Sequence, residues 1–372
     1  MFRSLKILVL FYVLVFLSLF PVSAGCAESL PRGIFVMALD EPCALSSRQE
    51  IIKLVNLAKR TRAKIIFIQI YRGNKAWFPS LIADSSPYKD CLKNIPEDPL
   101  KLLIKQAHSF GIEVHVWLNM LSLSKNKNAP LLQKYGFSVL TSNLKEKYSL
   151  EDYKIDNQYF LEPGDMRVRR ELSGIIEEVI RSYPGLDGIL FDYVRYPDKN
   201  PAYGYTEMNM GRFKRASGVK TIKEEDEIWK DWKRAQVTET LQEFIDTARR
   251  INPNIQVSAT GCMPIQRAYY EAFQDWTFWL NRGLVDFVIA MDYSPDHLEF
   301  ERWISAIKAK VSDFRKVKIA VGAYKLGSFP GEFKEELRFS ENAGAGGCVI
   351  FHYSSLLDNP VLANILEEDS EF

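Results

Sequence analysis

The sequence predicts an α/β protein folded as a closed (β/α)8 barrel, and three observations support this prediction. Apolar runs of strand length alternate with helical patterns eight times along the chain. Several of these runs are apolar at consecutive positions, which is typical of strands buried on both faces of a parallel sheet. Polar and aromatic residues follow the ends of the runs, where barrel enzymes carry their functional groups.

The predicted elements follow one another in a regular order. The first helix begins at the capping box Ser47-x-x-Glu50, and the next helix begins at Asp98, with proline at its first position. Asp165 caps a third helix, and a long helix covers about 228–251. The eight strands are predicted at 33–39, 64–70, 114–118, 188–191, 256–259, 286–291, 318–321 and 348–351.

Two long excursions interrupt the alternation, one after the third strand (about 119–164) and one after the fourth (about 196–227). Loops of this length in a compact domain usually carry function. A doubly wound open sheet is the alternative fold, but no glycine-rich phosphate loop follows the first strand. The prediction is therefore a TIM barrel with long loops after strands three and four.

The N-terminus has the pattern of an export signal. A basic start is followed by an apolar stretch over 7–20 that is short for a membrane span, and then by small residues ending at Ala24. We expect a signal peptide at 1–24, a linker at 25–32 and the barrel at 33–372. Two alternatives are a lipobox, in which Cys26 would carry a lipid, and an uncleaved anchor. The expected location is periplasmic, envelope-associated or secreted.

The composition limits the classes of partner and cofactor that we expect for this protein. The formal net charge is +1, which gives no indication of nucleic-acid binding. The chain has four histidines and neither an HExxH nor a CxxC motif, so no metal or other cofactor is expected. Aromatic residues make up 13% of the chain, which suits both a carbohydrate site and a large core. The sequence does not indicate an oligomeric state.

Export would place the cysteines in an oxidising compartment. Cys43 and Cys91 follow the first and second predicted strands, so their loops lie at the same end of the barrel. We therefore predict a Cys43–Cys91 disulfide. Cys348 lies within the last predicted strand and is expected to be a small core residue.

The segment LDGILFDYVRYP (186–197) is the most informative in the chain. It contains a buried strand that ends abruptly at Asp192, at the end of the barrel where catalytic groups lie. The alternative is a structural aspartate that caps the next helix or pairs with Arg195. A similar strand ends at Asp292, and we expect the two carboxylates to face each other. Asp187 and Asp286 lie at the opposite end and are expected to be structural.

Two carboxyl groups in one cavity lined by aromatic residues meet the requirements for cleaving a glycosidic bond. One carboxyl group must protonate the leaving oxygen while the other is ionised. Asp192 is predicted as the nucleophile or base, and Asp292 as the acid. Glu162, in the third loop, is the rival acid, and Glu41 is a weaker candidate. Asp292 and Glu162 each have a structural alternative, as hydrogen-bonded carboxyls outside the chemistry.

Candidate substrate-binding residues are those that follow the other strands. Arg72 offers a fork of donors, Trp77 a ring on which a sugar could stack, and Asn119 both a donor and an acceptor. His352 has a structural alternative as a core histidine, and His108 and His115 are expected to be structural. The full predicted binding set is Tyr71, Arg72, Trp77, Asn119, Tyr193, Arg195, Tyr293 and His352.

Six motifs occur in order along the chain: Asp98-Pro-Leu, Gly-Ile-Glu-Val-His-Val-Trp-Leu-Asn119, Leu-Glu-Pro-Gly-Asp165, Asp187-Gly-Ile-x-Phe-Asp-Tyr, Gln274-Asp-Trp and Phe351-His-Tyr-Ser-Ser-Leu. Taken together, they resemble those of the glycosyl-hydrolase-like family 10 group of bacterial envelope proteins, over about 33–357. The resemblance implies a (β/α)8 barrel and the cleavage of bacterial polysaccharides, including peptidoglycan glycan strands, with Asp192 as the acidic residue of the fourth strand. Family members often carry two adjacent acids there, whereas this chain has Asp192-Tyr193.

The sequence thus predicts an exported glycoside hydrolase that acts on a bacterial or environmental polysaccharide, with peptidoglycan glycan strands as one candidate, through two carboxylates. The alternative is a barrel that binds glycan without cutting it. A metal-dependent hydrolase is a third hypothesis, which the scarcity of histidine disfavours.

Overall fold

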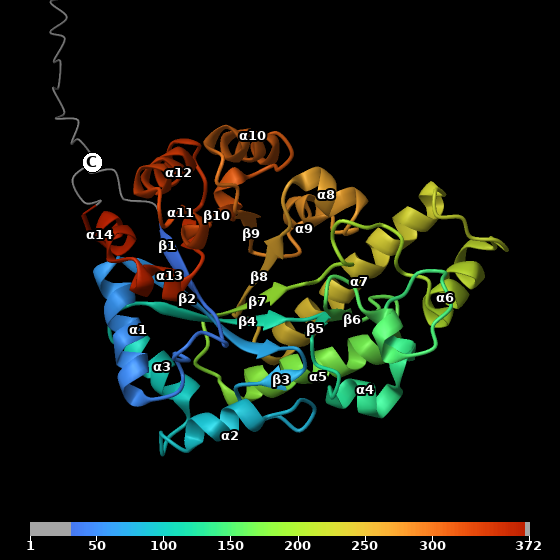
Figure 1. Ribbon diagram of the computed structural model, residues 1–372, viewed down its shortest axis with the longest axis horizontal. Helices are drawn as coiled ribbons and strands as arrows, with labels where there is room; N and C mark the ends of the chain where they lie inside the picture. Colours follow the sequence, from blue (N-terminus) through green and yellow to red (C-terminus); the bar gives the residue numbers. More distant parts are fainter. Residues whose placement is uncertain (1–30, 369–372) are drawn as a thin grey trace, which may run out of the picture.

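The predicted barrel is confirmed. A computed structural model describes residues 31–368, and eight parallel strands close into a barrel surrounded by helices (Figure 1). The strands pair in sequence order, and β1 closes the barrel by pairing with both β2 and β11. The barrel strands are β1 (Arg32–Val36), β2 (Ala63–Arg72), β4 (Glu113–Asn119), β7 (Gly188–Asp192), β8 (Gln256–Gly261), β9 (Phe287–Asp292), β10 (Val317–Val321) and β11 (Cys348–Ile350).

The helices begin at the capping residues that the sequence indicated. Ser47 accepts a hydrogen bond from the Glu50 backbone N–H, and Asp98 and Asp165 cap their helices in the same way. The helices are α1 (Arg48–Arg60), α2 (Ser86–Leu92), α3 (Pro99–His108), α4 (Pro130–Tyr135), α5 (Met166–Ser182), α6 (Glu207–Ser217), α7 (Glu227–Ile251), α8 (Ile265–Tyr270), α9 (Trp276–Asn281), α10 (His297–Lys308), α11 (Ala323–Leu326), α12 (Pro330–Asn342), α13 (Tyr353–Asp358) and α14 (Pro360–Glu368).

Successive residues along the barrel strands point in turn into two separate hydrophobic cores. One set points into the barrel and forms a compact, largely aromatic cluster that includes Phe35, Phe67 and Trp117. The other set points outward and packs beneath the helices in a much larger cluster, as Phe191 does against Phe244 of α7. The parity of a strand residue therefore decides whether its side chain reaches the barrel interior or the helix layer.

The two long excursions fold over the carboxyl ends of the strands and beyond them. The first contains an antiparallel pair, β5 (Ser122–Ser124) with β6 (Tyr159–Phe160), besides α4. The second contains α6, which packs on the start of α7 through Tyr205, Phe213 and Trp229 at the right of Figure 1. A short strand, β3 (Lys75–Ala76), turns back along the end of β2.

The predicted Cys43–Cys91 disulfide is wrong for this structure, because both cysteines are free thiols. Their thiols are close enough for a hydrogen bond from Cys91 to lower the pKa of Cys43. Neighbouring loops thus bring the two cysteines together, as expected, without a covalent link. Cys348 is buried within β11.

The predicted signal peptide, its cleavage site and Cys26 lie outside the described residues. Within residues 31–368, none of the helices combines the length and the apolar character that a membrane span requires.

Candidate active site

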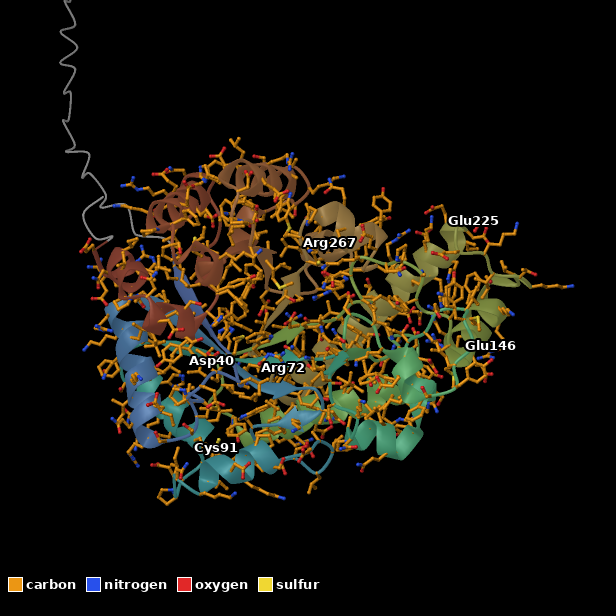
Figure 2. The ribbon with its side chains drawn as sticks, viewed as in Figure 1. Asp40, Arg72, Cys91, Glu146, Glu225 and Arg267 are labelled. Carbon is orange, nitrogen blue, oxygen red and sulfur yellow. The ribbon has the colours of Figure 1, made fainter. Side chains whose placement is uncertain are left out.

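A cavity of about 370 Å³ opens at the carboxyl ends of the barrel strands. Ligand sites in barrels occupy this end, and the volume lies in the range of small-ligand pockets. Arg72 at the end of β2 and Arg267 of α8, both labelled in Figure 2, line the cavity. The principal polar residues of the lining are Gln69, Arg72, Asn119, Asp192, Arg195 and Asp198. Its aromatic residues are Phe35, Trp117, Tyr193, Tyr293 and Phe351.

Asp192 is the most firmly held carboxyl group in the cavity. It ends β7 at an inward position and is only 3% exposed. The Trp117 indole N–H donates to Oδ2 at 3.0 Å, and the Thr260 hydroxyl donates to Oδ1 at 2.6 Å. The Tyr193 backbone N–H also donates to Oδ1, at 2.7 Å. These donors come from three neighbouring strand ends and fix the orientation of the carboxyl group.

The two residues that frame Asp192 are also held tightly. Tyr193 has a φ of +55°, a strained conformation for a tyrosine, and such strain is often found at functional sites. The Arg195 guanidinium lies over the Tyr193 ring at 4.2 Å, and its Nη1 is 3.6 Å from Asp192 Oδ1. Arg195 Nε and Nη1 are buried without a hydrogen-bond partner, so they are available to a ligand.

A second carboxyl group lines the same cavity and was missed by the sequence analysis. Asp198 lies six residues after Asp192, in the loop that follows β7, and Arg267 Nη2 is 3.7 Å from its Oδ2. Burial acts to raise the pKa of Asp198, but the guanidiniums of Arg195 and Arg267 outweigh burial and hold the pKa below its usual value. The signal for Asp198 was the Tyr-Pro-Asp sequence directly after the strand-end motif.

A chain of amides supports the side of the cavity next to β2. Gln69 accepts a hydrogen bond from the Ala38 backbone N–H and donates to Asn119 Oδ1 at 3.1 Å. Asn119 is paired in register with Asp192, so its amide is held beside the carboxylate. Arg72 ends β2, and its buried Nε has no hydrogen-bond partner. The predicted residues Arg72, Asn119, Tyr193, Arg195 and Tyr293 therefore share one cavity with Asp192.

The structure contradicts the placement predicted for Asp292. In β9, Phe287 and Ile289 point into the barrel, so Asp292 has the outward parity. It is fully buried under the outer helices, where it is near Glu336 of α12, and does not line the cavity. Met291 and Tyr293, its two neighbours in the sequence, line the cavity instead.

Glu162 also lies away from the cavity, which corrects its prediction as the rival acid. It is fully buried and accepts hydrogen bonds from the Thr141 hydroxyl at 2.9 Å and the Tyr196 hydroxyl at 2.5 Å. The Gly164 backbone N–H donates to it as well. Burial raises the pKa of Glu162 against these hydrogen bonds. Its position favours the structural alternative, in which it joins the two long excursions.

Two predicted binding residues are likewise placed elsewhere. Tyr71 faces the outer core, is fully buried, and accepts a hydrogen bond from Asn74. His352 is hydrogen-bonded to Ser354, with its Nδ1 3.9 Å from Asp40 Oδ1, and does not line the cavity. Glu41 is exposed on the loop after β1.

Trp77 lines a neighbouring cavity rather than the barrel mouth. Asp187 and Asp286 each accept a hydrogen bond from a backbone N–H at the start of an adjacent strand, those of Val114 and Val257. His108 is paired with Asp187. In the part of the chain that the structure describes, no three histidine, cysteine, aspartate or glutamate side chains are grouped as ligands of a metal ion.

Sequence comparisons relate this chain to proteins named glycosyl hydrolases. The chain is 23% identical over 314 residues to glycosyl hydrolase DigH of Escherichia coli K12, covering 75% of this chain and 66% of that protein. It is 20% identical over 268 residues to glycosyl hydrolase YngK of Bacillus subtilis, covering 66% and 49%. The match thus spans about two thirds of the first relative and about half of the second.

The solved structures that resemble this one show the fold alone. An α-L-fucosidase from Paenibacillus thiaminolyticus gives a TM-score of 0.63 at 13% identity, over 92% of this chain and 49% of that one. The catalytic domain of a β-amylase from Paenibacillus polymyxa gives 0.56 at 12% identity, over 92% and 99%. The sequence model of the glycosyl hydrolase-like 10 family matches residues 31–327. The chain therefore belongs to the glycosyl hydrolase-like 10 family.

Proposed function

We propose that this protein is an exported glycoside hydrolase that cleaves a bacterial or environmental polysaccharide, with peptidoglycan glycan strands as the first candidate. The observation that carries the proposal is Asp192, a buried carboxyl group at a barrel strand end, oriented by donors from three strand ends. Family membership and the glycosidase names of the relatives support the reaction class. The proposal of export rests on the N-terminal sequence pattern.

Asp192 acts in this proposal as the nucleophile or as the base that activates water. Its donors leave it oriented toward the cavity, where a sugar ring would be flanked by Tyr193 and Tyr293. Because hydrogen bonds already fix the orientation of this carboxylate, it does not need to reorient when positive charge develops on the sugar ring in the transition state. Arg195 beside it offers two buried nitrogens to sugar hydroxyls.

Asp198 takes the place of Asp292 and Glu162 as the second carboxyl group. It lines the same cavity, and while burial acts to raise its pKa, the guanidiniums of Arg195 and Arg267 act to lower it. A sugar bound between Asp198 and Arg195 would engage the guanidinium and weaken its hold on the carboxylate. The pKa of Asp198 would then rise on binding, which would allow it to protonate the leaving oxygen.

The direct test is to incubate the purified protein with glycan strands freed of peptide and with a panel of neutral and acidic polysaccharides. New reducing ends would support hydrolysis and would identify the substrate. Binding without any product would favour the alternative, a non-catalytic glycan-binding barrel. A stereochemical assay of the product by NMR would then distinguish retention from inversion.

Replacing Asp198 tests its assignment as the second carboxyl group. Asp198→Asn keeps the size of the side chain but removes the acid, and we expect glycan cleavage to fall by ~10²-fold. The fold should be kept, because the side chain is 27% exposed and its ion pair with Arg267 is at 3.7 Å. Initial rates of reducing-end formation measure the effect. A variant as active as the wild type would remove Asp198 from the mechanism.

Replacing Glu162 tests whether it is structural. In Glu162→Gln we expect the rate of glycan cleavage to stay within a few-fold of the wild type, because the side chain does not line the cavity. Its Tm should fall by a few degrees, since one of the three donors to the carboxylate would face an amide N–H group. Thermal denaturation and initial rates separate the two effects. A large loss of kcat with an unchanged Tm would restore Glu162 as a catalytic acid.

A further inference from the structure

A second and larger cavity, of about 890 Å³, lies next to the barrel mouth. The two cavities share three lining residues, namely Arg72, Ser124 and Gln158. The two cavities therefore adjoin each other at these residues, beside the end of β2. A polysaccharide that places one sugar at Asp192 would place a neighbouring sugar in this second cavity.

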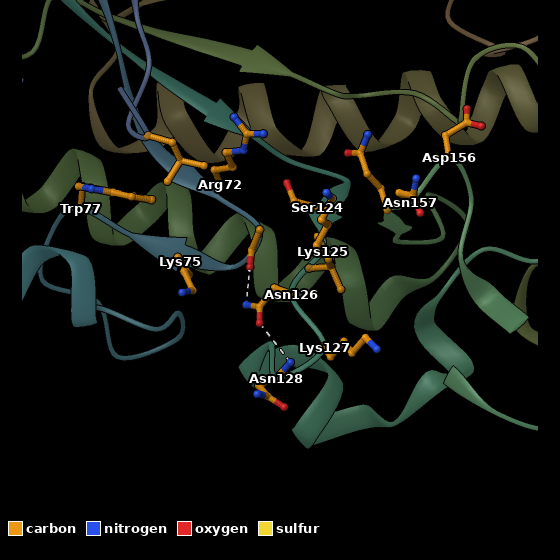
Figure 3. Close-up of a pocket in the computed structure, with 14 residues that line it drawn as sticks. Arg72, Lys75, Trp77, Ser124, Lys125, Asn126, Lys127, Asn128, Asp156 and Asn157 are labelled. Carbon is orange, nitrogen blue, oxygen red and sulfur yellow. Dashed lines mark hydrogen bonds between the residues drawn. The ribbon is translucent and has the colours of Figure 1, made fainter. Parts of the chain in front are cut away.

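The walls of the second cavity are built into the fold. The turn after β2 is joined to the loop after β5 by a hydrogen bond from the Asn126 amide to the Gly73 carbonyl, at 2.7 Å (Figure 3). Gly73 has a φ of +63°, and a Cβ there would lie 2.9 Å from the Leu123 carbonyl oxygen, so only glycine fits. Ser124 between these segments also has a positive φ, +52°. These contacts shape the cavity before any ligand binds.

The lining of this cavity is cationic. Arg72, Lys75, Lys125 and Lys127 contribute positive charges, and Asp156 contributes a negative one. Lys127 is paired with Glu151, which leaves the positive charges of two lysines and one arginine against the single negative charge of Asp156. Arg72 matters most, because its Nε is buried without a hydrogen-bond partner. A buried donor without a partner is costly unless a ligand or water satisfies it.

The remaining walls suit a sugar ring. Trp77 is 7% exposed and lies beside Arg72 on one side of the cavity, while Asn157 and Asp156 lie on the opposite side (Figure 3). An aromatic wall with amide groups opposite offers both a stacking face and hydrogen bonds to hydroxyls. The lysines distinguish this cavity from the barrel mouth, because Lys75 and Lys125 line the second cavity and none of the described lysines lines the first.

We propose that the second cavity is a subsite for a sugar that carries a carboxylate, bound next to the sugar at Asp192. The inference rests on the proposed function only in placing the neighbouring sugar of the polysaccharide at Asp192. The second cavity would bind an acidic sugar whether or not a glycosidic bond is cut. Arg72 would receive the carboxylate with its planar fork of donors, and Lys75 and Lys125 would add attraction from the rim. Both ring carboxylates, as in uronic acids, and ether-linked carboxylates, as in muramic acid, present this chemistry.

Titration calorimetry with paired oligosaccharides tests the subsite. The probes are a uronic-acid oligosaccharide and a muramic-acid oligosaccharide, each compared with the same molecule after reduction of its carboxyl groups to alcohols. Measurements use the Asp192→Asn protein, in which bound probe is not consumed. We expect at least one acidic probe to bind ~10-fold more tightly than its reduced form, with the difference shrinking at high salt. The probe that shows the difference identifies the source of the carboxylate.

Charge variants then locate the effect. We expect Lys75→Met/Lys125→Met to reduce the preference for the acidic probe to about twofold or less, and Arg72→Met to abolish it and weaken the binding of both probes. The matched control is Lys64→Met/Lys105→Met, which removes the same charge from exposed lysines away from both cavities. Equal affinity for acidic and reduced probes in the parent protein would overturn the proposal, as would a preference that survives in both cavity variants. A preference without any cleavage by the wild type would sustain the subsite and refute only the hydrolase.

Discussion

An Asp192→Asn variant should bind glycan and fail to cut it. Asparagine keeps the shape of the side chain but can act neither as a nucleophile nor as a base, so we expect the cleavage rate to fall by ~10²–10⁴-fold. The amide oxygen can still accept from Thr260 and Tyr193, whereas the Trp117 indole N–H would face the amide N–H group, so thermal denaturation checks that the variant stays folded. The measurement is the initial rate of reducing-end formation, together with calorimetric affinity and thermal denaturation.

Asp292→Asn is the matched control for this experiment. It makes the same chemical change at the end of β9, but on the outward face of the barrel wall. We expect it to cut glycan within a few-fold of the wild-type rate. Loss of cleavage in both variants, with folding intact, would contradict the assignment of the chemistry to the barrel mouth. Unchanged cleavage in Asp192→Asn would refute the mechanism altogether.

The second large effect concerns stability and again involves Asp292. Burial raises the pKa of Asp292 to about 8, and the Glu299 carboxylate adds to the rise, against the Ser294 backbone N–H and Lys325. In the unfolded chain an aspartate has a pKa of about 3.9. The folded state therefore holds a proton that the unfolded state has released throughout the range between these values.

The sign of the pH dependence follows from this difference. Below about pH 4 both states are protonated at Asp292, and its full contribution to the free energy of unfolding is present. As the pH rises to about 8 that contribution is lost, and the loss is complete once the folded carboxyl ionises. The fall is ~6 kcal/mol, at ~1.4 kcal/mol for each pH unit between the two pKa values. Glu336, near Asp292, has a pKa raised to about 9, mainly by burial, and acts in the same direction.

Asp292→Asn should flatten this pH dependence, because asparagine resembles the protonated acid and does not titrate. We expect the free energy of unfolding of the variant to fall several kcal/mol less than that of the wild type between pH 4 and pH 8. Urea denaturation at a series of pH values measures the difference. Asp246→Asn, at an exposed position of α7, should leave the wild-type profile unchanged. Parallel profiles for the wild type and Asp292→Asn would mean that Asp292 ionises normally in the folded protein.

Much of the fold could be predicted because its signals are local. A side-chain cap at Ser47, Asp98 or Asp165 depends on residues two or three positions away, so the sequence displays the whole interaction. Strand positions followed from runs of apolar residues in the same way. Strand ends were less predictable: β1 ends at Val36, three residues before the end of its apolar run. Where a strand stops depends on its partners in the sheet.

The candidate site was predicted in part, and the error at Asp292 shows why. Asp192 and Asp292 both end apolar strands, followed by tyrosine in both cases. Strands buried on both faces lack the alternation that would reveal which positions point inward. The prediction treated the two strands as equivalent, whereas Asp192 shares the inward parity of Leu190 and Asp292 the outward parity of Ala290. Asp198 was missed for another reason: the Tyr-Pro-Asp sequence places it just after the strand end, but the direction in which a loop side chain points depends on the folded loop.

The sequence by itself determined the kind and order of the elements, the eight-stranded barrel, and Asp192 as the first candidate for chemistry. Those features depend on neighbouring residues, whose periodicity and capping are visible along the chain. Only the tertiary structure decided which carboxyl groups share a cavity, that Arg72 joins two cavities, and that Glu162 is enclosed between the excursions. These features depend on barrel closure and strand parity, which bring together residues far apart in the chain.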